Sequence, residues 1–336
     1  MTTADGHPTP STAPVRVAMV GCGAIARRMH VPALLAAGAR IPVFVSRTEA
    51  SARAAADEAG GGEVATDWRA VVMRDDLDAV SVCTPNALHA PIAIAAAEAG
   101  KHVLVEKPFA TTVGDADAMI AAADRAGTVL MAAHNLRFAA PFAPMRDAIA
   151  RGDIGAPTSA RVAFCHAGPQ AWSPGSVWFR DAGEAGGGAL MDLGGHVIDT
   201  LRFVLADEFD EVTATLDRLP IDEDAVVGFR TSAGVVGAFH AGWRSRGGGD
   251  QSVVVHGEAG SITFDLAGGL RITRDGSEPE PVAMDAPPDD PCAAFVRAVA
   301  QGAAPSPSAA DGRAAVAVIA AAYDAARTGT TRKVAR

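Results

Sequence analysis

The feature that most constrains the fold is a glycine-rich turn near the start of the chain, Gly21-Cys22-Gly23-Ala24-Ile25-Ala26. The turn follows an apolar run over residues 15–20 and opens an alanine-rich stretch over 24–37. In such a strand-turn-helix unit, the first glycine permits a tight turn and the second lets the backbone approach a pyrophosphate, while the third small residue lets helix and strand pack closely. The sequence therefore predicts a dinucleotide-binding turn, with Gly21, Gly23, Ala24 and Ile25 beside the ligand.

Around this turn, residues 15–136 alternate short β-branched runs with longer alanine-rich segments, which is the pattern of parallel strands joined by helices. We expect strands over 15–20, 41–46, 79–83, 102–106 and 129–134. Helices are expected over 24–37, 87–98 and 113–126, and they are long enough for right-handed crossovers. The first domain is therefore predicted to be an α/β Rossmann domain with a doubly wound parallel sheet, over residues 15–136.

The pattern changes after Arg137, where glycine-rich loops separate a few helical segments from several alternating runs. Helices are expected over 141–151, 188–203, 292–300 and 309–327. The alternating runs predict antiparallel strands over 158–165, 211–216, 225–231, 235–243, 252–256 and 261–264. Residues 137–336 should thus form an α+β substrate-binding and oligomerisation domain with a largely antiparallel sheet, whereas residues 1–14 read as a disordered tail.

Length and charge narrow the possible partners. A chain of 336 residues is longer than one hydrophobic core comfortably supports, which agrees with two domains. The net charge of −10 disfavours an extended nucleic-acid or anionic-membrane surface, and no apolar run is long enough to span a bilayer. The four cysteines lack zinc-type spacing, and the N-terminus lacks signal-peptide features. We expect a cytoplasmic protein without nucleic-acid, membrane or metal partners.

The end of the second predicted strand bears on the choice of cofactor. It reads Val45-Ser46-Arg47-Thr48, where an enzyme that prefers NAD(H) would usually present an acidic residue to the ribose hydroxyls. A carboxylate there would repel a 2'-phosphate, whereas Ser46 and Arg47 can donate hydrogen bonds and positive charge to it. The sequence therefore predicts a preference for NADP(H), with NAD(H) as a possible cofactor.

Three further motifs occur in order along the chain: Cys83-Thr84-Pro85-Asn86-Ala87-Leu88-His89, Glu106-Lys107-Pro108, and the glycine-rich segment over 186–199 that contains Asp192 and His196. Together with the glycine turn, they resemble the signature of the Gfo/Idh/MocA family, the glucose-fructose oxidoreductase and inositol dehydrogenase group. The resemblance covers nearly the whole chain after the tail. It implies a Rossmann domain followed by an α/β domain with a largely antiparallel sheet, and a substrate bound between them near the nicotinamide.

The resemblance also implies roles for single residues. Lys107, Asp192 and His196 would form the polar catalytic group. The residues that would border the cofactor are Thr84, Pro85, Asn86 and His89, with Glu106 close to its ribose and Asn135 and Arg137 near the nicotinamide or substrate. In this family a neighbouring subunit often covers the outer face of the second sheet, so we expect a homodimer or homotetramer.

Physical chemistry supports the catalytic assignments independently. Oxidation of a secondary alcohol needs a hydride acceptor and a group that removes the hydroxyl proton, and His196 can exchange a proton near neutral pH. Lys107, at the carboxyl end of a parallel strand, can stabilise the developing alkoxide. Asp192 lies four residues before His196, on the same helix face, where it could orient substrate hydroxyls. A metal site at this pair would lack a third ligand with fitting spacing.

A loop-like stretch before the glycine-rich segment carries polar and aromatic residues: His166, Gln170, Trp172, Trp178, Arg180 and Asp181. A sugar-like ring would find hydrogen-bonding partners and an aromatic face there. We therefore expect substrate contacts from this stretch, chiefly from His166, Trp172 and Arg180, although such aromatic side chains can equally belong to a core or an interface.

Other dehydrogenase chemistries are disfavoured, because the single tyrosine, Tyr323, has no lysine placed for short-chain chemistry and the cysteine ligands of zinc alcohol dehydrogenases are missing. We expect hydride transfer at a secondary hydroxyl or ketone of a sugar, cyclitol or related polyol. One alternative is a glycosidase that retains its nicotinamide and acts through transient oxidation and elimination. Another is a cofactor-binding regulator without turnover, which the presence of Lys107, Asp192 and His196 weakens.

Overall fold

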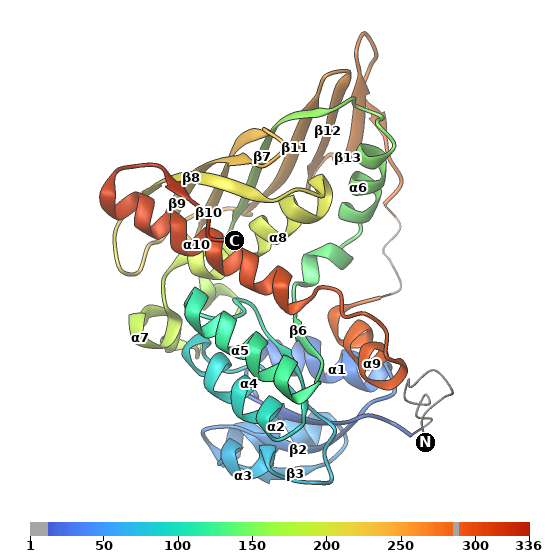
Figure 1. Ribbon diagram of the computed structural model, residues 1–336, viewed down its shortest axis with the longest axis vertical. Helices are drawn as coiled ribbons and strands as arrows, with labels where there is room; N and C mark the ends of the chain where they lie inside the picture. Colours follow the sequence, from blue (N-terminus) through green and yellow to red (C-terminus); the bar gives the residue numbers. More distant parts are fainter. Residues whose placement is uncertain (1–12, 285–288) are drawn as a thin grey trace. The chain divides into compact units, whose positions relative to one another are not determined.

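The computed structural model describes residues 13–284 and 289–336, so most of the expected tail over 1–14 lies outside the described residues. The chain divides into two compact units (Figure 1). Among the described residues, the first unit comprises 13–133 and 289–313, and the second comprises 134–284 and 314–336. The sequence-based division at residue 136 assigned 289–313 to the second domain, whereas this segment packs within the first unit.

Within residues 13–133, six strands form a parallel sheet in the order β3-β2-β1-β4-β5-β6. The strands are β1 (Arg16–Val20), β2 (Arg40–Val45), β3 (Glu63–Ala65), β4 (Ala79–Val82), β5 (His102–Val105) and β6 (Leu130–Ala132). The prediction of a doubly wound parallel sheet is confirmed. The strand order reverses between β1 and β4, and ligands of such sheets bind outside the carboxyl ends of the strands at this point.

Four helices of the first unit begin at a side-chain cap that the sequence supplies. The elements are η1 (Ala26–His30, a π-helix), α1 (Val31–Ala36), α2 (Glu49–Glu58), α3 (Trp68–Val72), η2 (Asn86–Leu88), α4 (His89–Glu98), α5 (Val113–Ala126) and α9 (Pro291–Gln301). The side chains of Thr48, Asp67, Thr112 and Asp290 accept backbone N–H groups at the starts of α2, α3, α5 and α9. These caps satisfy donors that a helix start leaves unpaired.

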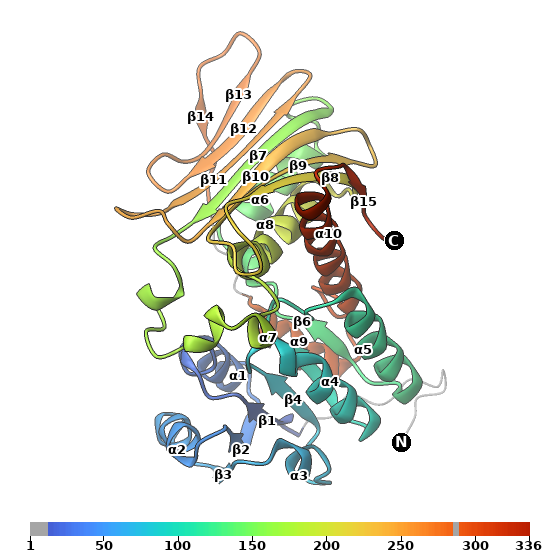
Figure 2. The same cartoon turned by 90° about the vertical axis from the view of Figure 1, so that its left-hand side faces the viewer.

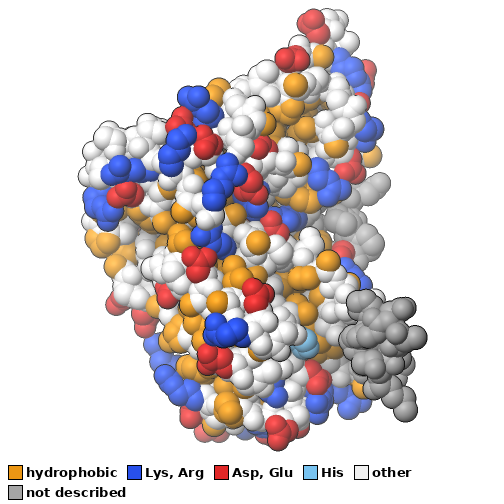
Figure 3. Space-filling model, viewed as in Figure 1, with side chains coloured by type: hydrophobic (Ala, Val, Ile, Leu, Met, Phe, Trp, Pro, Cys, Tyr) orange, Lys and Arg blue, Asp and Glu red, His pale blue; other side chains and the backbone are white. Residues whose placement is uncertain are grey.

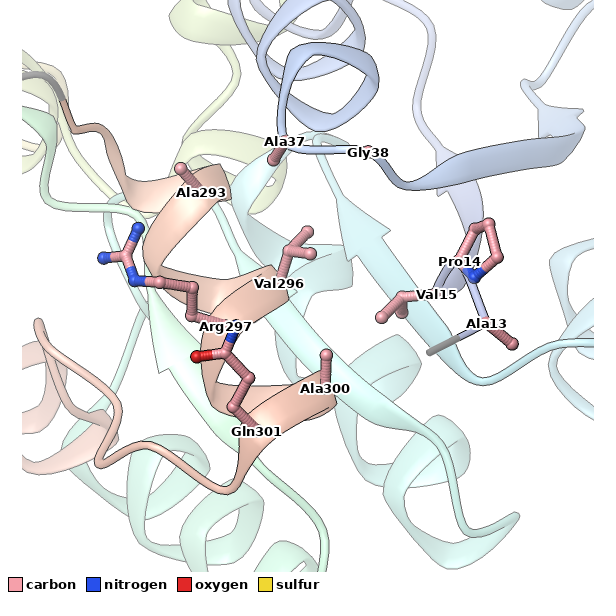
Figure 4. A pocket seen from close by; sticks show the side chains of 10 residues that line it. All are labelled: Ala13, Pro14, Val15, Ala37, Gly38, Ala293, Val296, Arg297, Ala300 and Gln301. Atoms are coloured by element: carbon pink, nitrogen blue, oxygen red, sulfur yellow. The ribbon is translucent and has the colours of Figure 1, made fainter. Parts of the chain in front are cut away.

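A cavity of about 290 Å³ lies where α9 faces the end of α1 and the start of β1 (Figure 4). Its lining includes Val15, Ala37 and Val296, and Arg297 at its edge donates to Asp289 at 2.9 Å. The cavity is at the amino end of β1. The glycine turn follows the carboxyl end of the same strand, so this cavity is separate from the expected cofactor position.

In the second unit, nine strands of the described residues form a sheet in the order β14-β13-β12-β11-β7-β10-β9-β8-β15. The strands are β7 (Pro157–Cys165), β8 (Phe209–Leu216), β9 (Asp224–Thr231), β10 (Val236–Gly242), β11 (Asp250–Gly257), β12 (Gly260–Asp265), β13 (Gly269–Arg274), β14 (Glu280–Pro281) and β15 (Arg332–Lys333). The sheet is antiparallel except at the pair β7 and β10, which runs parallel. The expected largely antiparallel sheet is confirmed, with this one departure.

One face of this sheet is covered by helices (Figures 1 and 2). The unit as a whole contains the helical elements η3 (Asn135–Phe138), α6 (Phe142–Ala150), η4 (Pro169–Ala171), η5 (Val177–Arg180), α7 (Ala182–Ala185), α8 (Ala189–Leu205) and α10 (Ala309–Thr328), the last of which begins in the first unit. The core joins Met145 of α6, Ile198 of α8 and Ile319 of α10 to sheet residues such as Val227 and Phe239. Helix α8 is buried almost throughout, so its polar residues are held inside the unit.

Basic and acidic side chains are interspersed over the face of the molecule in view in Figure 3. None of the helices in the described part of the chain is both long enough and apolar enough to cross a membrane.

Candidate active site

The two glycines of the turn differ in what surrounds them. Gly21 has φ +94° and its N–H donates to the Val45 carbonyl oxygen at 2.8 Å. A Cβ at this position would lie 2.3 Å from the carbonyl oxygen of Cys83, so both the backbone conformation and the packing require glycine. Gly23 is exposed, and a Cβ there would meet no described atom within 4 Å. The fold itself therefore does not require glycine at position 23.

Two further observations fit a pyrophosphate at this turn. Burial raises the pKa of the Cys22 thiol to about 12, so Cys22 adds no negative charge at neutral pH. The hydroxyl oxygen of Thr84, which follows β4, is buried and has no hydrogen-bond partner among the described residues. The open space at Gly23 and this hydroxyl are features that a bound dinucleotide would use.

Exchanging either glycine for alanine should separate folding from ligand binding. We expect Gly21→Ala to lower the melting temperature clearly, because the new Cβ would overlap the backbone at Cys83. We expect Gly23→Ala to change the free energy of unfolding by no more than about 1 kcal/mol. It should nevertheless weaken dinucleotide binding about tenfold or more. Thermal melting and fluorescence titration with the dinucleotide measure the two effects, and unchanged binding in Gly23→Ala would contradict this interpretation.

Glu106 lies directly after β5, and both of its carboxylate oxygens have partners within the first unit. One oxygen is 2.8 Å from Nε2 of His30, whose Nδ1 lies 2.9 Å from the Ser81 hydroxyl. The other accepts the backbone N–H of Lys107 at 2.9 Å. Burial acts to raise the pKa of Glu106, but the hydrogen bond and charge of His30 outweigh it and lower that pKa. Glu106 thus fixes the backbone at Lys107.

His89 is fully buried and bridges two backbone segments. Its Nδ1 lies 2.8 Å from the Pro108 carbonyl oxygen, and its Nε2 lies 3.0 Å from that of Thr84. Burial lowers the pKa of this imidazole. The ring therefore ties the segment after β4 to the segment after β5, which carries the half-buried Lys107.

In the second unit, Asp192, His196 and Asp199 follow one stripe of α8 and are 4%, 8% and 1% exposed. The Asp192 carboxylate accepts Nε1–H of Trp243 at 3.0 Å. The His196 ring packs against Phe164, with ring centroids 5.4 Å apart. Asp192 and His196, four residues apart, thus lie on one face of a buried helix, as the sequence predicted.

Asp199 continues the stripe and is paired with Arg137 from η3. The guanidinium donates to both carboxylate oxygens, at 2.7 and 2.6 Å, and the side chains are 11% and 1% exposed. Arg137, expected near the nicotinamide or substrate, therefore joins η3 to α8. Asn135 lies in the same short helix, two residues earlier.

The loop before the glycine-rich segment is organised around an aromatic cluster. Trp178 stacks on Phe179 at 3.8 Å, and Trp172 and Trp243 both meet Phe179 edge-on, at 5.5 and 6.2 Å. Since Trp243 donates to the Asp192 carboxylate, these rings pack around the hydrogen-bond donor of Asp192. Asp181 caps α7, the exposed Arg180 donates to Glu223 at 2.8 Å, and His166 accepts the N–H of Gly168 at 2.9 Å.

Sequence reasoning did not identify His30, Asp199 or Trp243 as partners of the expected site residues. Lys107 belongs to the first unit, whereas Asp192 and His196 belong to the second. Throughout residues 13–284 and 289–336, no three His, Cys, Asp or Glu side chains are grouped as metal ligands would be.

Comparisons with known proteins agree with this architecture. Residues 15–134 match the family described as "Oxidoreductase family, NAD-binding Rossmann fold", and residues 142–263 match "GFO/IDH/MocA C-terminal domain". A 1,5-anhydro-D-fructose reductase of Ensifer adhaerens is 38% identical over 74% of this chain and 74% of its own. A levoglucosan dehydrogenase of Pseudarthrobacter phenanthrenivorans is 33% identical over 67% of this chain and 65% of its own. A solved levoglucosan dehydrogenase, in complex with NADH and levoglucosan, is 28% identical, with a TM-score of 0.87 and coverage of 96% of this chain and 100% of that one.

Proposed function

The chain belongs to the Gfo/Idh/MocA family of NAD-dependent oxidoreductases, and we propose that it transfers a hydride between a nicotinamide cofactor and a secondary alcohol or ketone of a sugar, cyclitol or related polyol. The observation that carries the proposal is the buried pair on α8, in which Asp192 and His196 stand one helical turn apart. The named substrates of the relatives, 1,5-anhydro-D-fructose and levoglucosan, support the polyol class.

The residues have separate tasks in this proposal. The backbone at Gly21, Gly23, Ala24 and Ile25 would receive the dinucleotide, which when bound supplies the hydride acceptor or donor. His196 removes the hydroxyl proton during oxidation and returns it during reduction. Lys107 donates a hydrogen bond to the reacting oxygen and stabilises negative charge on it. Asp192, already fixed by Trp243, accepts hydrogen bonds from neighbouring substrate hydroxyls.

The decisive experiment is a screen of sugars and cyclitols against NADP(H) and NAD(H), followed by nicotinamide absorbance. We expect stoichiometric turnover of the cofactor with at least one polyol. Hydrolysis of an aryl glycoside without net change in free cofactor would instead favour the glycosidase mechanism. Tight dinucleotide binding with no turnover of any polyol would favour the regulator and defeat the proposal.

We also propose that NADP(H) binds more tightly than NAD(H). Ser46 follows β2 directly, Arg47 is exposed beside it, and no carboxylate occupies either position. Arg47→Ala should weaken NADP(H) binding about tenfold with little effect on NAD(H), because only the former carries a 2'-phosphate. Arg40→Ala, at the other end of β2, is the matched control. The solved relative was obtained with NADH, so tighter NAD(H) binding by this chain is the result that would overturn the preference.

We further propose a homodimer or homotetramer that uses the face of the second sheet opposite α8. On β9, Ala225, Val227 and Phe229 are buried in the core, while Val226 between them is 48% exposed, as is Val236 at the start of β10. A second subunit would remove such side chains from water. Light scattering on the purified protein measures the state, and a monomer at micromolar concentration would exclude it.

A further inference from the structure

The start of α8 is buried and has no side-chain cap of its own, because the residue before it is Gly188. Asp222, just before β9, supplies the missing acceptors. Its two carboxylate oxygens accept the N–H groups of Gly188 at 3.0 Å and Leu190 at 2.7 Å, and its carbonyl oxygen accepts that of Ala189 at 2.8 Å. One residue thus satisfies three consecutive donors that a helix start exposes.

Tyr323 of α10 completes this arrangement. Its hydroxyl donates to the Asp222 carboxylate at 2.7 Å and also lies 3.1 Å from the N–H of Gly188. Asp222 is 0% exposed, so bulk solvent does not reach its carboxylate. The single tyrosine of the chain, which lacks the nearby lysine of short-chain dehydrogenases, therefore uses its hydroxyl to bond the start of α8.

The glycines before α8 are explained by this contact. A Cβ at Gly187 would lie 2.2 Å from the Tyr323 hydroxyl, and a Cβ at Gly188 would lie 1.9 Å from the carbonyl oxygen of Asp222. Both distances are far below van der Waals contact, so any side chain at these positions would push the helix start away from Asp222 and Tyr323.

The segment that holds Asp222, which precedes β9, is also linked to the Asp192 carboxylate. The backbone carbonyl oxygen of Glu223, the residue after Asp222, accepts the backbone N–H of Trp243 at 2.7 Å. Trp243 in turn donates its indole N–H to the Asp192 carboxylate at 3.0 Å. Residues 222–223 therefore contact α8 at two places: directly at its first turn, and through Trp243 at Asp192. Two attachment points fix both the position of the helix along its axis and its rotation.

We propose that Asp222 and Tyr323 are positioning residues for the reaction, which set the placement of Asp192 and His196 by fixing the first turn of α8. The inference rests on the proposed function, since it needs the two α8 side chains to act on substrate. A misplacement of about 1 Å in a reacting group can cost about 10²-fold in rate. Dinucleotide binding belongs to the first unit and should not respond.

The test compares Tyr323→Phe and Asp222→Asn with Asp290→Asn. Asp290 caps α9 by accepting two backbone N–H groups, at 2.7 and 3.0 Å, on one carboxylate oxygen, so it controls for the same Asp→Asn exchange at a helix start away from α8. We expect kcat to fall roughly tenfold in Tyr323→Phe and roughly 10²-fold in Asp222→Asn, with the dinucleotide Kd within about twofold of wild type. Asp290→Asn keeps an amide oxygen that can accept the same two N–H groups, so the melting temperature should change little and kcat should stay within about twofold.

Equal losses of kcat in Asp222→Asn and Asp290→Asn would overturn the proposal. A normal kcat in Tyr323→Phe would also overturn it, and this variant is the test if Asp222→Asn does not fold. Amide hydrogen exchange at Ala189 and Leu190 gives a readout that does not depend on turnover. Faster exchange there in Tyr323→Phe supports the contact, and unchanged exchange contradicts it. If the wild-type protein turns over no polyol, the proposed function fails, while the exchange result still reports separately on the positioning of α8.

Discussion

Replacing Lys107 or His196 with alanine should lower kcat by roughly 10² or more, as expected for groups that stabilise charge and transfer a proton at the reacting oxygen. Dinucleotide binding should remain largely intact, because the glycine turn and Thr84 are untouched. Steady-state kinetics with the best polyol of the screen and a fluorescence titration with the dinucleotide measure the two quantities independently.

Matched controls for these variants are available on the same chain. Lys333→Ala removes a surface lysine that pairs with Asp210 at 2.7 Å, and His256→Ala removes an exposed histidine of β11. Both should retain nearly full turnover. Near-normal rates in Lys107→Ala and His196→Ala as well would mean that neither side chain handles the proton.

Arg137→Leu should cost roughly 3–5 kcal/mol in the free energy of unfolding, because it leaves the Asp199 carboxylate buried without its countercharge. Asp199 is 1% exposed and takes both of its short hydrogen bonds, at 2.7 and 2.6 Å, from that guanidinium. Denaturant titration gives the free energy directly. The double variant Arg137→Leu/Asp199→Leu should recover part of the loss, since it removes the stranded charge.

The control for this prediction is Arg151→Leu. Arg151 pairs with Asp153 at 2.7 Å, but the two side chains are 61% and 25% exposed, so water screens the pair. Its loss should cost no more than about 1 kcal/mol. Similar values for Arg137→Leu and Arg151→Leu would show that the Asp199 charge finds another partner or is neutralised.

Local sequence signals predicted some of the regular elements, but α2 and α3 were not expected, although Thr48 and Asp67 cap them. Helix α5 was expected over 113–126 and has these bounds, because Thr112 caps its start and the left-handed Gly127 ends it. Strand β3 was not predicted, since it has three residues and none is buried. The packing of 289–313 in the first unit was also not foreseen, because it depends on contacts between segments distant in the sequence.

The candidate site could also be predicted only in part. Motifs placed Asp192 and His196 on one helix, but the partners of the site residues come from remote segments without a local signal. Trp243 is 51 residues from Asp192, Arg137 is 62 residues from Asp199, and Tyr323 is 135 residues from Gly188. Such pairings are consequences of tertiary packing. A single sequence can therefore predict which residues carry the chemistry, but not which residues hydrogen-bond to them and fix their orientation.

Because residues 289–313 pack in the first unit, the first unit cannot be obtained as one continuous fragment of the chain. A fragment cut after Ala133 would lack α9, so the surface of α1 that α9 contacts would be bared to solvent. Exchange of the dinucleotide module between relatives, as in building a chimera, must therefore transplant two separate stretches of chain. A splice at the single boundary read from the sequence would leave an incomplete module on both sides.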